Sequence, residues 1–219
     1  MFLGVQLKWG IAPNGKLGAL TMFQSQYTES ILRRFGMQDS KPAISPMVES
    51  FFTGFVSKVD KSPVSVKMYG QMIGSLLYLA LRTRPNILAS VLVLILARIQ
   101  NAPTAYCHRA CKRILRYLRG TDFVSSYFTG NTNAQSFVDS DYAADTEDCK
   151  SMTGYIVNLA GASVIWGSRK QTVVTISTCE AEYYALTHAC KEVIWLGRVL
   201  KEAGLGRMTH LEVCPSVIG

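Results

Sequence analysis

Two aspartates stand in a stretch whose other residues are typical of a β-strand. The stretch runs from Ser136 to Ala143, and its Phe, Val and Tyr residues favour an extended backbone. Because the side chains of a strand alternate between two faces, Asp139 and Asp141 share a face with Phe137. A half-buried carboxylate is costly without a cation, and Mg²⁺ is commonly held by one or two carboxylates together with substrate phosphates. The spacing therefore indicates a divalent-metal site on this strand.

A glutamate near the start of the last predicted helix is the second candidate ligand. The sequence Ser177-Thr178-Cys179-Glu180 matches a helix capping box, and a helix is expected from Glu180 to about Ala203. At about 100° per residue, Glu182 falls on the apolar stripe of this helix, whereas Glu180 points to the opposite side and serves the cap. A salt bridge or a partly exposed first turn would also explain Glu182. The functional hypothesis is that Glu182 leans towards Asp139 and shares a divalent ion with it.

The elements that must position these acids lie in the second half of the chain. After residue 130 the sequence shows short strand signals, and Gly161 marks a tight turn between two of them. Several strands followed by a long helix fit an α/β layer. The expected strands are Gln135–Tyr142, Gly154–Leu159, Ala162–Trp166 and Thr172–Ile176.

The first half predicts a β-hairpin followed by helices. The turn formers of Ala12-Pro13-Asn14-Gly15 separate two strand candidates, and the stretch from Lys41 to Pro63 is typical of a linker or an irregular loop. The expected strands are Phe2–Trp9 and Leu17–Phe23, and the expected helices are Gln24–Phe35, Val64–Leu81, Pro85–Gln100 and a segment from Pro103 to Gly120.

Charge is divided unevenly along the chain. Of the formal net charge of +8, residues 1–130 contribute +11, with 16 Lys and Arg against 5 Asp and Glu; residues 131–219 contribute −3, with 7 against 10. On the helix that ends at Gly120, five cations fill one angular sector and apolar residues fill another. A solvated surface explains this pattern, and contact with nucleic-acid phosphates is the alternative. The five cations are Arg109, Lys112, Arg113, Arg116 and Arg119.

Several classes of protein do not fit the composition. The six cysteines form no CxxC pair, which favours reduced thiols inside a cell. Cys107, His108 and Cys111 lie near one another on a helix, but no second ligand pair accompanies them, so zinc is not expected. The most apolar run, Ile87–Ala97, has 11 residues and is too short for a hydrocarbon layer of about 30 Å. Since a secretory leader is not evident, we expect an intracellular protein, cytoplasmic or nuclear, without a membrane partner.

Motifs in a fixed order cover nearly the whole chain. They are Met68–Ala80 with Thr83-Arg84-Pro85, then Lys112–Thr121, then Phe137–Ala143, Lys150-Ser151 with Gly154-Tyr155, and Glu180-Ala181-Glu182-Tyr183. This order closely resembles the Pol polyprotein of copia-type LTR retrotransposons. The resemblance implies the end of a reverse transcriptase at 1–63, a helical connection at 64–130 and a truncated ribonuclease H-like domain at 131–219. The implied fold is mixed α/β, in which a β-hairpin and helices precede a mixed sheet with a long helix.

The resemblance also implies the chemistry of a ribonuclease H. Asp139 matches the family's first metal-binding aspartate and Glu182 the following glutamate, while Asp141 has a weaker claim. The implied reaction is hydrolysis of the RNA strand of an RNA–DNA hybrid with two Mg²⁺ ions, one activating water and the other stabilising the leaving oxygen. The implied partners are that hybrid, held through phosphate and 2′-hydroxyl contacts, and the rest of the Pol polyprotein.

Two departures from the family pattern affect activity. The polymerase's paired-aspartate motif would lie before Met1, so no polymerase active site is expected. The family's third acid stands in an Asp-Asn element after a Val-Cys pair, but here Val213-Cys214 leads into Pro215-Ser216. We therefore expect a fragment with little or no nuclease activity alone.

Other functions also fit the sequence. A non-catalytic nucleic-acid-binding remnant would use the arginine-rich helix, and its affinity would fall steeply with salt. A translated relic would have no selected function. The tetrapeptide Arg113-Ile114-Leu115-Arg116 matches a short Arg-x-Leu-Arg host-targeting pattern, but a secreted effector is not expected without a leader.

Overall fold

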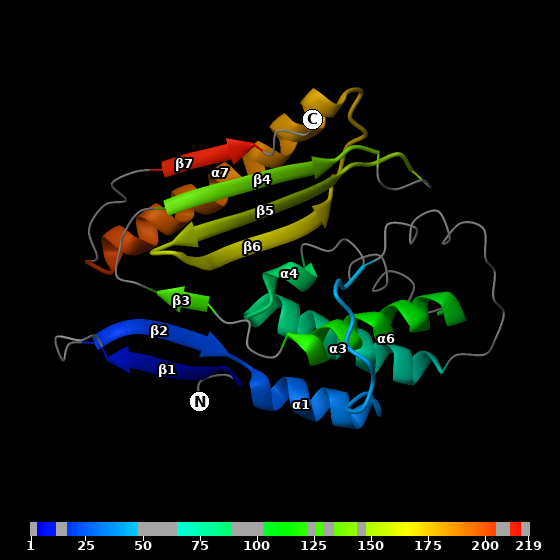
Figure 1. Cartoon of the computed structure of the whole chain (residues 1–219). Coiled ribbons are helices and arrows are strands. Elements are labelled where there is room, and N and C mark those ends of the chain that lie inside the picture. Colours follow the sequence, from blue (N-terminus) through cyan, green and yellow to red (C-terminus); the bar gives the residue numbers. More distant parts are fainter. Residues whose placement is uncertain are drawn as a thin grey trace. The chain divides into compact units, whose positions relative to one another are not determined.

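The computed structural model describes residues 4–11, 17–47, 65–88, 103–121, 126–128, 134–143, 148–204 and 211–215. These residues form a mixed α/β fold, with strands, a group of helices and a second sheet that carries a long helix, as predicted (Figure 1). The chain divides into two compact units, Met1–Leu7 with Met22–Ser125, and Lys8–Thr21 with Ser126–Gly219. The division into three domains stays a prediction.

The hairpin strands belong to a small sheet. Strands β1 (Gln6–Ile11), β2 (Leu17–Phe23) and β3 (Ser126–Phe128) are neighbours in the order β1-β2-β3. The predicted turn at residues 12–15 lies outside the described residues. Most of this sheet falls in the second unit.

The first unit is helical. It contains α1 (Ser25–Arg34), α3 (Val66–Arg82), α4 (Pro85–Leu88) and α6 (Ala105–Gly120). The hydroxyls of Ser65 and Thr104 cap α3 and α6 by accepting from the backbone N–H three residues on, each at 3.3 Å. Both helices bury an apolar stripe completely, and burial raises the pKa of the Cys111 thiol on α6 to about 12. Cys111 is therefore a core residue of this unit.

The Thr83-Arg84-Pro85 motif joins α4 to the end of α6. Arg84 is buried, its Nη1 donates to the Thr121 carbonyl oxygen at 2.5 Å, and its guanidinium lies over the Tyr117 ring. The Asn86 side-chain amide donates to the Tyr117 hydroxyl at 2.6 Å. The motif thus has a structural role. The predicted helix Pro85–Gln100 is described only to Leu88; its remainder, with most of the apolar run Ile87–Ala97, lies outside the described residues.

The second unit is a mixed sheet with one long helix. Strands β4 (Ala134–Asp141), β5 (Met152–Leu159), β6 (Ala162–Lys170) and β7 (Leu211–Pro215) lie in the order β6-β5-β4-β7, and α7 (Thr178–Glu202) runs between β6 and β7 in the chain. The pairs β4–β5 and β5–β6 are antiparallel, whereas β4–β7 is parallel. Helix α7 covers one sheet face (Figure 1). On that face Val138 and Tyr155 pack against Ala185 and Ala189.

One predicted strand is wrong. Residues 172–176 have no strand structure, and β6 instead continues to Lys170. Val173, Val174 and Ile176 have high strand propensity, but their side chains are 45%, 54% and 89% exposed. Among the described residues no strand pairs with this segment, and its only buried side chain is that of Thr175, so propensity alone does not form a strand here.

Among the described residues, no helix has both the length and the apolar character needed to cross a bilayer.

Candidate metal centre

Strand β4 presents its aspartates on the side opposite to its buried residues. Burial alternates along the whole strand, so that Val138 and Ser140 are buried while Phe137, Asp139 and Asp141 are exposed. The three exposed residues are those predicted to share a face. Helix α7 packs on the Val138 side, so the Asp139 carboxylate is not enclosed by the apolar core.

The first turn of α7 places Glu182. The Glu180 N–H donates to the Ser177 hydroxyl at 3.1 Å, which confirms the predicted cap. The Glu180 carboxylate in turn accepts from the Ile176 N–H at 2.7 Å, one residue before the position expected for a capping box. Glu182 is half-buried, and among the described residues its Oε2 is buried without a hydrogen-bond partner.

The two acids interact electrostatically near the backbone of Ser140. The Ser140 N–H donates to Asp139 Oδ1 at 2.8 Å, and the same N–H also acts on the Glu182 carboxylate, where it lowers the pKa. Two stronger influences act in the opposite direction. Burial, and after it the Asp139 charge, raise the pKa of Glu182 above its usual range. Burial and the same Asp139 charge also raise the pKa of Asp141. Asp139 is therefore electrostatically coupled to both other carboxylates.

The pair of carboxylates on Asp139 and Glu182 is of the kind that binds a hard divalent cation. Carboxylate oxygens are the protein ligands that Mg²⁺ prefers, and a cation would offset the repulsion between Asp139 and Glu182. The parallel pairing of β4 with β7 sets Cys214 beside Phe137 and Pro215 beside Val138. The residue after the Val-Cys pair thus lies next to the strand that carries Asp139, and proline offers no side-chain oxygen. Within the described residues, no group of three or more His, Cys, Asp and Glu side chains is arranged to hold a metal.

The predicted cationic face of α6, in the first unit, is partly used within the protein. Arg113 Nη2 donates to Ser45 Oγ at 3.2 Å, and Arg116 Nε donates to the Lys41 carbonyl oxygen at 2.6 Å. Arg119 Nε donates to the carbonyl oxygen of Gln38. We call residues 38–47 the anchored segment. Of the five cations, Arg109 and Lys112 are exposed, and the other three are half-buried.

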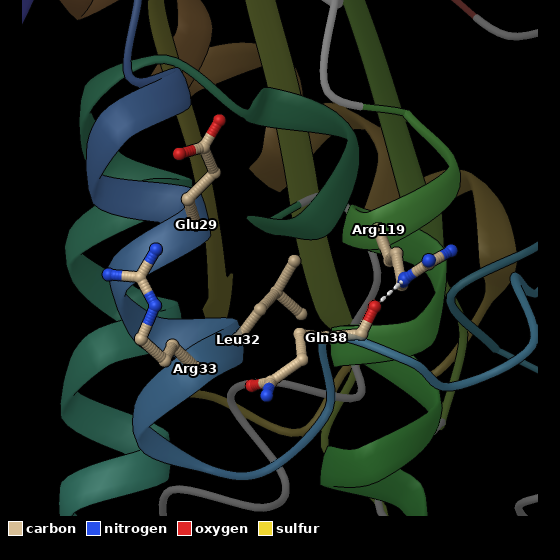
Figure 2. Close-up of a pocket in the computed structure, with 5 residues that line it drawn as sticks. All are labelled: Glu29, Leu32, Arg33, Gln38 and Arg119. Atoms are coloured by element: carbon tan, nitrogen blue, oxygen red, sulfur yellow. Dashed lines mark hydrogen bonds between the residues drawn. The ribbon is translucent and has the colours of Figure 1, made fainter.

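The described part of the stretch predicted as a linker or an irregular loop, residues 41–47, has no helix or strand and belongs to the anchored segment. The Ala43 N–H donates to the Arg116 carbonyl oxygen at 3.2 Å, and a Cβ on Gly120 would come within 2.9 Å of Pro42 Cβ. Its first part therefore packs on α6, while residues 48–64 lie outside the described residues. A pocket of about 330 Å³ opens beside it between α1 and α6 (Figure 2). It is lined by Glu29, Leu32, Arg33, Gln38 and Arg119.

Comparison with known proteins decides the family. No family model and no solved structure matches the chain. It is 36% identical over 208 residues to the retrovirus-related Pol polyprotein from transposon TNT 1-94 of Nicotiana tabacum. It is also 34% identical over 196 residues to an uncharacterized mitochondrial protein of Arabidopsis thaliana, covering 89% of this chain and 77% of that protein. The chain belongs to the transposon Pol polyprotein family.

Membership of this family confirms the resemblance drawn from the motifs. The extent of the match shows how much of a Pol polyprotein the chain represents. The match to the tobacco polyprotein covers 90% of this chain but 15% of that relative. The chain therefore corresponds to a small part of a Pol polyprotein.

A third relative concerns the host-targeting pattern. The chain is 38% identical over 130 residues to secreted RxLR effector protein 161 of Plasmopara viticola. This match covers 58% of this chain and 90% of that protein. In this structure the tetrapeptide Arg113–Arg116 lies within α6, where Ile114 and Leu115 are completely buried. The tetrapeptide is thus part of a packed helix rather than an exposed linear segment.

Proposed function

We propose that the chain supplies the metal-binding part of a ribonuclease H that hydrolyses the RNA strand of RNA–DNA hybrids. The observation that supports this most is the electrostatic coupling of Asp139 on β4, which accepts from the Ser140 N–H, with Glu182 on α7, whose Oε2 is buried without a hydrogen-bond partner among the described residues. Membership of the Pol polyprotein family supports the same function, because the motif order resembles the region where that family places this enzyme. The ribonuclease H-like interpretation of the mixed sheet rests on that resemblance.

The two acids would hold Mg²⁺ and would act together. When bound, the ion would supply Lewis acidity and an activated water. Asp139 is held in place by the N–H of Ser140, and Glu182 has a buried oxygen free of partners among the described residues. Two like charges in such proximity favour a shared cation over two separately ionised groups.

The same geometry leads us to propose that the chain has little activity by itself. The family's motif order puts a further acid at the position of Pro215, and the residue paired with Pro215 on β4 is Val138, which precedes Asp139 in the chain. Two protein ligands hold a divalent ion less firmly than three, and a poorly held ion positions its substrate badly.

Restoring a carboxylate at position 215 tests this function. The full chain is incubated with a labelled RNA–DNA hybrid and Mg²⁺, and released RNA is measured. We expect almost no release by the natural sequence and at least about a tenfold gain for Pro215→Asp, because a third ligand fixes the ion.

Two further variants make the result specific. Pro215→Ala restores the backbone N–H without a carboxylate and should give no gain. Asp139→Asn added to Pro215→Asp should abolish the gain. Release by the natural chain that Asp139→Asn abolishes would contradict the proposed inactivity, and a gain that persists in the double variant would contradict the proposed site.

A further inference from the structure

A buried glutamine stands directly after β6. Gln171 is 2% exposed, and its backbone N–H donates to the Ser151 carbonyl oxygen at 2.8 Å. Its side-chain Nε2 lies within hydrogen-bond distance of Ala181 O at 3.0 Å, Thr153 Oγ1 at 3.1 Å and Ser140 Oγ at 3.4 Å. One amide group thus joins β4, β5 and the first turn of α7.

Two of these acceptors are the immediate chain neighbours of the candidate metal ligands. Ser140 follows Asp139, and Ala181 precedes Glu182. The Ser140 N–H also donates to Asp139 Oδ1, and it lowers the pKa of Glu182. Moving Ser140 relative to Ala181 would therefore move one acid relative to the other.

A second set of hydrogen bonds steadies the same region. The Ser151 hydroxyl bonds to the Thr175 hydroxyl at 3.0 Å and accepts from the Ala143 N–H at 3.1 Å, just beyond the end of β4. Through the Gln171 N–H, these bonds connect to the amide that touches α7. The end of β4 and the start of α7 are therefore held by one buried network.

The network is not ideal for stability alone. The Gln171 Oε1 is buried without a hydrogen-bond partner among the described residues, which is unfavourable for an amide oxygen. An apolar side chain of similar size would remove that unfavourable group, but it would also remove the donor shared by Ser140 and Ala181.

We propose that Gln171 is a positioning residue, which sets the separation of Asp139 and Glu182 for a shared divalent cation. This inference rests on the proposed function. Gln171 does not itself contact the ion. It acts through the backbone on either side of each ligand, in the way that outer groups orient metal ligands elsewhere.

The first test measures metal affinity with Mn²⁺ as the probe. The free Mn²⁺ is followed by electron paramagnetic resonance in the presence of the full chain, and Asp139→Asn identifies the binding that belongs to the acid pair. We expect Gln171→Leu to weaken this binding about tenfold, at the lower end of the effect of losing outer-shell groups. Gln24→Leu is the matched control, because Gln24 is a buried glutamine of the first unit whose amide bonds to Gly4 and Thr83. It should leave Mn²⁺ affinity unchanged.

The second test needs no metal. In Gln171→Leu, amide hydrogen exchange should accelerate near the lost side chain, that is, in the first turn of α7 and at Ser140. Residues Val193 to Leu196, farther along α7, should keep their protection. A loss of general stability would accelerate both regions equally. If Gln171→Leu does not fold, Thr153→Val removes one acceptor from the network and should give the same local pattern with a weaker effect on Mn²⁺.

The two tests separate the inference from the proposed function. Local acceleration without any Asp139-dependent Mn²⁺ binding in the natural chain would support the network and contradict the metal site. Asp139-dependent binding that is equal in the natural chain and in a folded Gln171→Leu variant would overturn the positioning role. Equal loss in Gln24→Leu would overturn it too.

Discussion

The cations of α6 and the acids of β4 and α7 were predicted as binding groups by the same kind of reasoning, but their surroundings in the structure differ. Three of the five α6 cations donate to the anchored segment, residues 38–47. In the second unit, burial and then the Asp139 charge raise the pKa of both Glu182 and Asp141, and Glu182 has a buried oxygen without a partner among the described residues. Clustered charge is better evidence of a ligand where the protein does not itself supply the opposite group.

Side-chain reach explains much of this difference. Arginine has a long stem and five N–H donors, so it folds back easily onto backbone carbonyls. Aspartate on a strand is short and accepts only, and its direction is set by the backbone. Repulsion between Asp139 and Glu182 is therefore hard to relieve by rearrangement, and a cation relieves it directly.

The largest effect that would sharpen this comparison is on stability. Arg116→Ala removes the donor to the Lys41 carbonyl, and hydrogen bonds from charged groups contribute about 1.5–3 kcal/mol. Since Arg116 is only half-buried, we expect a loss of about 1–2 kcal/mol in urea unfolding of the full chain. Lys112→Ala, an exposed cation on the same helix, should change stability by no more than about 0.5 kcal/mol. Equal losses would mean that the anchored segment does not depend on its arginine bonds.

A smaller effect concerns nucleic-acid binding through α6, which stays a prediction. If the helix contacts phosphates, the exposed Arg109 and Lys112 should contribute most. Replacing both by Gln should reduce the slope of log affinity against log salt by up to about two, because each phosphate contact contributes about 0.9. Fluorescence anisotropy with a labelled hybrid over a salt series measures the slope. A larger reduction of this slope in the double variant Arg113→Gln with Arg116→Gln would contradict the comparison. It would show that the arginines bonded to the anchored segment are the ones that bind nucleic acid.

Local sequence patterns predicted the elements around the acids well. Alternation along β4 and the cap at Ser177 each depend on residues a few positions apart, which is why the period of a strand and a capping box found them. The grouping of Asp139 with Phe137 follows from the same alternation. The helical period also selected Glu182 over Glu180, and sequence resemblance then supplied the order of the motifs.

Contacts between distant residues could not be predicted in this way. Arg116 and Lys41 are 75 residues apart, and a helical wheel gives the direction of a side chain but not what covers it. Position 215 comes next to Val138, the residue before Asp139, only through the parallel pairing of β7 with β4. Val173 and Val174 suggested a strand because propensity ignores whether a partner strand exists. The bridge made by Gln171 depends on three separate elements, and no local pattern reveals it.

The smallest expected effect tests the charge imbalance at the acids themselves. The pKa values of Glu182 and Asp141 are raised in the fold, partly by Asp139, so the folded state disfavours their ionised forms relative to the unfolded chain. Their contribution to stability is fully present below the unfolded pKa and is lost as pH rises through the carboxyl range. Asp139→Asn removes one cause of that loss while keeping an oxygen for the Ser140 N–H. It should therefore stabilise the metal-free chain at pH 7, by no more than about 1 kcal/mol, and should give no gain near pH 3.

Urea unfolding of both chains at a series of pH values measures this difference, and Asp148→Asn provides a control of opposite sign. Asp148 lies 2.6 Å from Lys170 Nζ, so its neutralisation should lower stability at pH 7. Adding Mg²⁺ should stabilise the natural chain but not the Asp139→Asn variant. The stability advantage of the variant at pH 7 should therefore shrink or reverse when Mg²⁺ is present. A gain of the same size at pH 3 and pH 7 could not come from carboxylate repulsion, because the acids are protonated at the lower pH, and the comparison between the two units would then lose its electrostatic basis.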